Sequence, residues 1–269
     1  MRIPFIKMHG LGNDFVVLDG RSEALPDLGR HARAALADRH SGIGCDQLIL
    51  LQPSDRADLL MRIFNPDGAE ASACGNATRA VGLLEGRPLR IETAGGIVTA
   101  RPDGGGISVD MGAPRFDWQA IPLAYAMDTS ALPVGWDALQ APAAVNVGNP
   151  HVVFFVEDAD GVPLDRLGPE IEQDNLFPEG VNVNVAQVTG SHSLKLRVWE
   201  RGAGLTRACG TGACASAVAA LRRRLVASPV IVNLPGGDLT IAWDGGGSVR
   251  MTGPATESFR GSFRLEDFA

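Results

Sequence analysis

Two cysteines of this chain stand in the same setting, each followed by a glycine where a helix is expected to begin. Cys74 lies in SACGNATRAV (72–81) and Cys209 lies in RACGTGACAS (207–216). A helix N-terminus carries unsatisfied N–H groups and about half a positive charge, so a thiol there is expected to be more acidic. The same N–H groups bind anions such as carboxylates. Each cysteine is therefore predicted to be a proton-transfer group beside a carboxylate site.

The two cysteine segments belong to an internal repeat. Residues 61–76 align without a gap on residues 196–211, so that Asn65 meets Glu200. Upstream, LGNDFVV lies over VGNPHVV, so that Asn13 meets Asn149. Either asparagine alone would be interpreted as a turn residue. Because they match across the repeat, we interpret both as site residues.

The repeat predicts two similarly folded halves. We place them at residues 1–115 and 116–256, followed by a tail at 257–269 that could pair with either half. Most segments are short runs rich in branched residues and bounded by Gly, Pro, Asp or Asn, which is typical of strands. The expected strands are 14–20, 47–53, 59–65, 97–102, 107–112, 151–158, 181–188, 194–200, 229–235, 239–244 and 248–253.

A helix is expected to begin at each cysteine motif, and the first of these ends at Gly86. A further helix is expected at 29–39. The predicted fold class is α+β, with two pseudo-symmetric halves. Each half is a curved, mostly antiparallel sheet or barrel around one central helix, and the active site is expected in the cleft between the halves.

Bulk properties exclude several classes of function. The chain has 269 residues and a formal net charge of −7. Nucleic acid is not expected as a partner, because phosphate binding needs a basic face. The first residues show no signal-peptide pattern, and no segment approaches the roughly 18 apolar residues of a membrane span. We therefore expect a cytoplasmic protein that acts on a small molecule, with no membrane partner.

Neither a metal nor a cofactor is expected. Cys209 and Cys214 are five residues apart, and the chain has no CxxC or HxxxH pair that would suggest zinc. Its only lysines, Lys7 and Lys195, are not in a setting typical of a Schiff base with pyridoxal phosphate. No nucleotide-binding glycine motif is present. Two structural disulfides are the alternative use of four cysteines, but a chain this long does not need them.

Two opposed thiols suit the inversion of a carbon centre. One thiolate removes the α-proton of an amino acid from one face, and the opposite thiol returns a proton to the other face. The two helix N-termini would stabilise the charge that develops on the carboxylate, without a cofactor. The other two cysteines, Cys45 and Cys214, are expected to be inert core residues. Arg62 and Arg197 alternate with apolar residues and are expected to be solvent-facing or structural.

At this point the motifs resemble those of the diaminopimelate epimerase family. They are KMHGLGNDF (7–15), GIGCDQL (42–48), FNPDG (64–68), ACGNATR (73–79), GNPH (148–151), VNVNV (181–185) and ERGAGLTRACGTGA (200–213). The resemblance covers nearly the whole chain and implies an epimerase that does not use pyridoxal phosphate. The implied reaction interconverts LL- and meso-2,6-diaminopimelate in bacterial lysine and cell-wall synthesis.

The resemblance also implies roles for individual residues. Cys74 and Cys209 would be the acid/base pair, and Arg201 would bind the distal carboxylate, which a guanidinium can hold bidentately. The α-carboxylate would be held by the amides of Gly75, Asn76, Gly210 and Thr211. The remaining substrate contacts would come from Asn13, Gln47, Asn65, Asn149, Asn182 and Glu200. The family further implies a homodimer, and a C-terminal tail that returns to the first half.

The chain departs from the family pattern after the first cysteine motif. The segment AVGLLEGRPLRIET (80–93) is shorter than is common in the family. We therefore expect a short first central helix. The N-terminal motif of that helix is intact.

Three alternative functions stay open. A proline racemase or hydroxyproline epimerase would use the same two thiols, but those relatives typically carry CGHG in the first motif, where this chain has CGNA. A dithiol redox protein would need two facing low-pKa cysteines but no polar substrate shell. A non-catalytic amino-acid-binding module would need the carboxylate site and neither thiol.

Overall fold

The chain folds into two units, each built around a sheet. The structure is a computed structural model that describes residues 1–72 and 74–268, so Ala73 of the first cysteine motif and Ala269 of the tail lie outside the described residues. Contacts divide the chain into two units, Met1–Val109 with Gly253–Ala269, and Asp110–Thr252. The sequence-based boundaries after 115 and 256 stay predictions.

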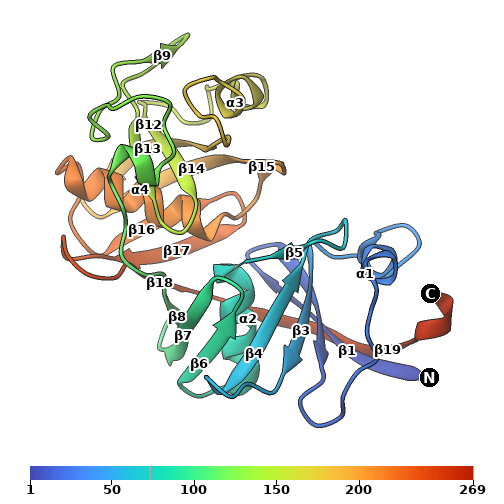
Figure 1. The fold of residues 1–269 in the computed structure, drawn as a ribbon. Helices are drawn as coiled ribbons and strands as arrows, with labels where there is room; N and C mark the ends of the chain where they lie inside the picture. Colours follow the sequence, from blue (N-terminus) through green and yellow to red (C-terminus); the bar gives the residue numbers. More distant parts are fainter. Residues whose placement is uncertain (73, 269) are drawn as a thin grey trace. The chain divides into compact units, whose positions relative to one another are not determined.

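The first unit contains nine strands, counted among the described residues. They are β1 (Arg2–Gly10), β2 (Asn13–Asp19), β3 (Gln47–Gln52), β4 (Leu59–Phe64), β5 (Glu70–Ala71), β6 (Leu89–Thr93), β7 (Gly96–Asp103), β8 (Gly106–Asp110) and β19 (Thr256–Arg264). Its helices are α1 (Arg30–Ala37), α2 (Gly75–Glu85) and a short 3-10 turn, η2 (Leu265–Asp267). The C-terminal strand β19 runs antiparallel to β1, and Figure 1 shows the red and blue arrows side by side.

The second unit repeats this plan. Its strands are β9 (Gly135–Trp136), β10 (Leu139–Gln140), β11 (Ala143–Asn146), β12 (Pro150–Phe155), β13 (Asn182–Gly190), β14 (Ser193–Glu200), β15 (Gly204–Thr206), β16 (Val230–Leu234), β17 (Gly237–Ala242) and β18 (Arg250–Gly253). Its helices are η1 (Trp118–Ala120), α3 (Leu164–Glu172) and α4 (Gly210–Arg222).

Strand pairing shows that the repeat in the sequence is a repeat of topology. In the first unit β2 pairs parallel with β3, and β4 pairs parallel with β6, while the neighbouring pairs are antiparallel. In the second unit β12 pairs parallel with β13, and β14 pairs parallel with β16, between antiparallel neighbours. Each unit is therefore a mostly antiparallel sheet with two parallel pairs at matching places.

One helix lies against each sheet (Figure 1). Helix α2 contacts β1, β6, β7 and β19, and α4 contacts strands from β11 to β17. Because β1 and β7 stand far apart in the strand order, the first sheet must curve around α2. Most of α4 is buried, and its inward residues are small, which allows close approach to the strands. The predicted fold class, a curved sheet around a central helix made twice, is confirmed.

The expected strands and the helices at 29–39 and at both cysteine motifs are confirmed. Helix α2 ends as expected at Gly86, which takes the left-handed conformation with φ of 63°. The sequence analysis missed helix α3, the strands β1, β6 and β11, the short strands β5, β9, β10 and β15, and the 3-10 turns η1 and η2. Helix α3 contains Gly168 and Pro169, which normally argue against a helix. Its apolar face is buried in the hydrophobic core of the second unit, which we call the second core. Among the described residues, no helix has the length and apolar composition needed to cross a bilayer.

Packing of α3 on β14 makes a testable prediction. A Cβ added at Gly168 would lie 2.4 Å from two atoms of the Trp199 ring, and that ring is held by a 2.6 Å hydrogen bond from its Nε1 to Glu172 Oε2. Gly168→Ala should therefore cost about 1–3 kcal/mol of overpacking, which exceeds the gain of about 1 kcal/mol in helix propensity. The urea midpoint should fall. Gly246→Ala is the control, because nothing lies within 4 Å of a Cβ there. An equal or higher midpoint for Gly168→Ala would contradict the prediction.

Candidate active site

The two cysteines hold the same position on their helices. Cys74 is the N-cap of α2, and its Sγ accepts a hydrogen bond from Ala77 N at 3.4 Å. Cys209 is the N-cap of α4, and its Sγ accepts from Gly212 N at 3.3 Å. Both backbones are extended at the cap, as N-cap residues usually are. Each sulfur thus takes the place of a capping oxygen, at the positive end of a helix.

The polar residues predicted for the first unit gather at one edge of its sheet. The pairing of β2 with β3 sets Phe15 opposite Gln47, and the pairing of β3 with β4 brings Gln47 to the end of β4, where Asn65 follows. Gln47 Nε2 donates to Asn65 Oδ1 at 3.4 Å. Asn76, in the first turn of α2, donates from Nδ2 to Asn13 Oδ1 at 3.0 Å. Strand ends and helix start therefore meet there.

A set of ion pairs orients Asn13. Asn13 Nδ2 donates to Asp46 Oδ2 at 3.0 Å, which turns the Asn13 carbonyl toward Asn76. Arg39 bridges Asp46 and Asp14, and Lys7 pairs with Asp14 at 2.5 Å. Burial alone would raise the pKa of Asp14, but hydrogen bonds and charge from Arg39 and Lys7 lower this pKa to about 2. Asp14 therefore stays charged at neutral pH and keeps the set together.

The second unit gathers its own predicted residues in the same way. The parallel pairing of β12 with β13 sets His151 opposite Asn182, and Asn182 Oδ1 accepts from the backbone N–H of Arg201 at 3.0 Å. Asn149 Oδ1 lies 2.8 Å from His151 Nε2. Glu200 ends β14 and accepts from Thr206 Oγ1 at 2.6 Å. The strand ends that carry these residues match those of the first unit.

The turn that carries Arg201 is held by a glutamate of α3. Glu172, at the end of α3, accepts from Gly202 N at 3.0 Å through Oε1, while its Oε2 accepts from the Trp199 indole. Arg201 Nη1 donates to the carbonyl of Glu179 at 2.6 Å. The guanidinium is therefore held by the loop after α3.

The environment of Cys209 corrects an expectation from the sequence. Cys209 is 3% exposed. Burial raises the pKa of its thiol well above the ordinary value, the negative charge of Glu200 raises it further, and hydrogen bonds from Thr211 and Gly212 lower it only in part. A helix start alone would make this thiol more acidic, but low polarity and a neighbouring carboxylate outweigh that effect. At neutral pH Cys209 carries its proton, so it is suited to be the acid.

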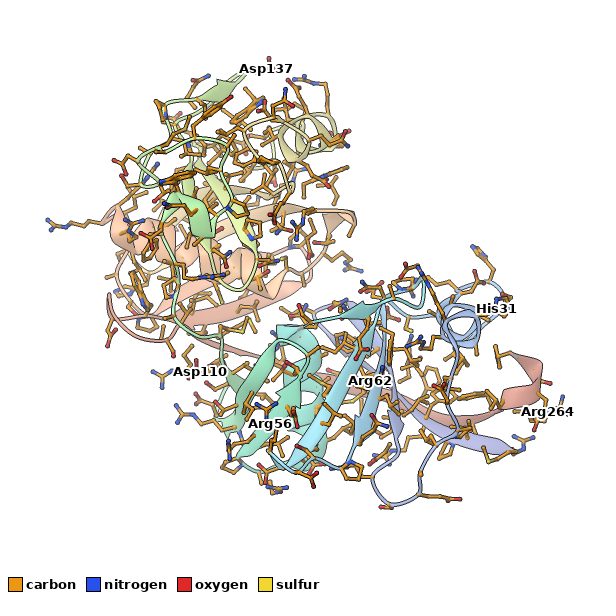
Figure 2. The ribbon with its side chains drawn as sticks, viewed as in Figure 1. His31, Arg56, Arg62, Asp110, Asp137 and Arg264 are labelled. Carbon is orange, nitrogen blue, oxygen red and sulfur yellow. The ribbon has the colours of Figure 1, made fainter. Side chains whose placement is uncertain are left out.

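The other cysteines and two arginines behave as expected. Cys45 is 2% exposed, and burial raises its pKa to about 11, so it is an inert core thiol. Cys214 is fully buried within α4. Arg62, labelled on β4 in Figure 2, makes two hydrogen bonds to Glu70 at 2.9 and 2.7 Å. Arg197 donates to backbone carbonyls, including that of Val162 at 2.7 Å. Both arginines are structural.

The sequence analysis missed three supporting residues, Asp46, His151 and Asn184. His151 and Asn184 are fully buried, and burial lowers the pKa of His151 to about 3. The signal was present in VNVNV, because alternation places Asn182 and Asn184 on one face of a strand that is otherwise apolar. Asp46 sits directly before Gln47, in a motif where only the glutamine was singled out.

Comparison with known proteins agrees with this architecture. The model of the family described as diaminopimelate epimerase matches residues 5–116 and 143–257. The chain belongs to the diaminopimelate epimerase family. The two matched stretches carry the two cysteine N-caps and every predicted site residue. Within the described residues no group of three or more His, Cys, Asp or Glu could hold a metal ion.

Full-length relatives carry the family name. A diaminopimelate epimerase from Erythrobacter litoralis is 65% identical, over 100% of both chains. One from Zymomonas mobilis is 55% identical, again over 100% of both. Among solved structures, a PhzF-family phenazine biosynthesis protein from Bacillus anthracis has a TM-score of 0.71 at 17% identity, covering 98% of this chain and 99% of its own. A hydroxyproline epimerase from Agrobacterium vitis has a TM-score of 0.65 at 17% identity, covering 97% and 91%. These structures share the fold with the family.

The position of Glu200 predicts a shift in thiol chemistry. Glu200→Gln removes the negative charge beside Cys209, so the pKa of the Cys209 thiol should fall. Alkylation of Cys209 by iodoacetamide, followed by peptide mass spectrometry across a pH series, should show a midpoint at lower pH than in the wild type. Glu172→Gln is the matched control, because Glu172 contacts Trp199 and Gly202 and is not among the groups that shift Cys209. An unmoved midpoint in Glu200→Gln would contradict the assignment.

Proposed function

We propose that this chain interconverts LL- and meso-2,6-diaminopimelate by moving the proton on one α-carbon, in the synthesis of lysine and of peptidoglycan precursors. The observation that carries the proposal is the pair of cysteine N-caps at matching places in the two halves of a member of this family. The reaction needs one base and one acid on opposite faces of a carbon, and the repeat supplies two such groups.

The proton balance needs only the two thiols. In the direction in which Cys209 is the donor, the Cys74 thiolate takes the α-proton, and a planar enediolate forms on the substrate carboxylate. The Cys209 thiol then gives its proton to the opposite face and is left as a thiolate. The reverse reaction exchanges the two roles, so no oxidant, metal or prosthetic group takes part.

Stabilisation of the enediolate falls to the helix starts. The amides of Gly75 and Asn76, with those of Gly210 and Thr211, stand at the positive ends of α2 and α4. Fixed N–H donors aimed at a developing negative charge are worth about 3–4 kcal/mol each in related oxyanion sites. For this the two units must bring their helix starts to one substrate, which is part of the proposal.

The polar shell suits a substrate with a second amino-acid head. Arg201 would take the distal carboxylate, and Glu200 would face the distal ammonium, while side-chain amides contact the rest. These amides belong to Asn13, Gln47, Asn65, Asn149 and Asn182. Hydroxyproline has no distal head, and the similarity to the Agrobacterium vitis enzyme, at 17% identity, concerns the fold alone. A dithiol redox protein would have no use for this shell.

Isotope exchange tests the proposal. Reduced protein is mixed with LL-diaminopimelate in D2O, the α-proton is followed by NMR, and the stereoisomers are separated by chiral chromatography. Deuterium uptake with formation of the meso isomer, without pyridoxal phosphate, is the expected result. Exchange on proline-type substrates alone would favour the alternative epimerase, and no exchange on any of them would remove the proposal.

Replacing either thiol should abolish turnover and spare binding. Cys74→Ser and Cys209→Ser each replace the acid/base group by a hydroxyl that ionises far less readily, so the rate should fall by roughly 10²–10⁴-fold or more. Diaminopimelate affinity, measured by calorimetry, should stay within a few-fold. Cys45→Ala removes a thiol from the core and should keep its turnover, which makes it the matched control. A binding module would be indifferent to all three changes.

The partner and location are part of the same proposal. We expect a cytoplasmic homodimer with a small-molecule substrate and neither nucleic acid nor membrane as a partner. Size-exclusion chromatography with light scattering should give twice the chain mass of 28.3 kDa. A single-chain mass at micromolar concentration would contradict the dimer and leave the reaction untouched.

A further inference from the structure

In the second unit, two buried side chains, those of His151 and Asn184, connect in series to Asn149. Asn184 lies on β13 and His151 on the adjacent strand β12 (Figure 1). Both side chains are fully buried. His151 Nε2 lies 2.8 Å from Asn149 Oδ1, and His151 Nδ1 lies 3.1 Å from Asn184 Nδ2. Asn149 itself is only partly buried. The two buried side chains can therefore determine whether Asn149 turns its oxygen or its NH2 group outward.

The amide of Asn184 has only one workable orientation. Its Nδ2 lies 2.9 Å from the carbonyl oxygen of Val152 and 3.3 Å from that of Asn182. Carbonyl oxygens only accept hydrogen bonds, so the NH2 group must face them. The Oδ1 atom faces the other way, toward the first turn of α4, where a Cβ at Gly212 would lie 2.6 Å from it. Reversing the amide would set its single Oδ1 atom against both of these carbonyl oxygens.

This orientation determines the proton on His151. The two hydrogens of the NH2 group go to its two nearest neighbours, the carbonyl oxygen of Val152 at 2.9 Å and His151 Nδ1 at 3.1 Å. An NH2 group cannot accept a hydrogen bond, so this Nδ1 atom must be the unprotonated nitrogen of the ring. The ring is neutral at ordinary pH, because burial lowers its pKa to about 3 and outweighs the raising effect of the hydrogen bond with Asn184, while the charge of Arg201 lowers the pKa further. A neutral ring with a bare Nδ1 carries its hydrogen on Nε2. Nε2 therefore donates to Asn149 Oδ1, which turns the Asn149 NH2 group away from the histidine.

We infer that Asn184 is a positioning residue that fixes the Nε2–H tautomer of His151 and so makes Asn149 present its NH2 group, a donor, to an anionic group of the substrate. The inference rests on the proposed function for the identity of the substrate, but its structural step concerns this chain alone. It also predicts which charge Asn149 prefers in the group that it contacts. A side chain that presents a donor favours a carboxylate and disfavours an ammonium at the same place.

The wild-type protein provides the first test. Protein labelled with 15N at its five histidines is examined by long-range 1H–15N correlation, and the His151 pattern is assigned by its loss in His151→Gln. We expect the pattern of a neutral ring protonated on Nε2, unchanged from pH 5 to pH 8. A ring protonated on Nδ1, or one that titrates near pH 6.5, would overturn the inference. This result does not depend on whether the chain turns over diaminopimelate.

A double-mutant cycle tests the path to Asn149. Asn184→Ala removes the donor that holds Nδ1, so KM for diaminopimelate should rise roughly 5- to 10-fold, the value of one side-chain hydrogen bond, while kcat changes less than about twofold. Asn149→Ala should raise KM by a similar factor, and the double variant should add little more, because the two residues act in series. If Asn184→Ala raised KM by the same factor in the wild type and in the Asn149→Ala variant, the inference would be overturned.

A matched control separates positioning from general destabilisation. Thr129 is buried in the same unit, and its Oγ1 donates to the carbonyl of Phe116 at 2.6 Å. Thr129→Val also removes one buried hydrogen bond, so its unfolding midpoint should fall as in Asn184→Ala. Its His151 spectrum and KM should stay as in the wild type. If Thr129→Val raised KM as much as Asn184→Ala, the effect would be one of stability, and the inference would fail.

Discussion

The structure depends on a cysteine at the N-cap of a buried helix. At this position the sulfur accepts the hydrogen bond that a capping oxygen would normally take. The backbone N–H groups of the first helical turn lie next to the sulfur. A group that can exchange a proton is thereby set beside donors for an anion, with no extra element needed. The rest of each unit serves to bury the helix behind this cap. Small residues along α4 let the strands approach the helix closely.

The two halves share a topology but differ in electrostatics. The repeat places Asn65 where the second half has Glu200, each at the end of the strand before its cysteine motif. In the second half the carboxylate helps to keep the Cys209 thiol protonated, while the first half has a neutral amide at the equivalent place. A duplicated helix start thus supplies two thiols, and burial together with the charge of Glu200 raises the pKa of the Cys209 thiol.

Each half orients an asparagine of the candidate site by a different set of contacts. In the first half, Asp46 fixes Asn13 within a set of ion pairs that lowers the pKa of Asp14 to about 2. In the second half, uncharged and fully buried groups orient Asn149. Both sets of contacts remove the freedom of an amide to rotate. This freedom would otherwise be lost at substrate binding, at a cost in affinity.

The sequence by itself determined the repeat, the cysteine-capped helices and most strands, because these follow from spacing and residue type along the chain. The repeat singled out the two cysteines with Asn13 and Asn149 as site candidates, and the other predicted site residues came from the resemblance to the family. The sequence did not reveal α3, since Gly168 and Pro169 disfavour a helix locally and only burial of its apolar face against the second core outweighs them. The sequence also did not predict the protonation state of Cys209. A helix start predicts an acidic thiol, whereas the fold buries that thiol beside Glu200 and raises its pKa. Solvation and non-local charge depend on which residues meet in space, so only the tertiary structure decided the protonation of Cys209 and the partners of Asn184.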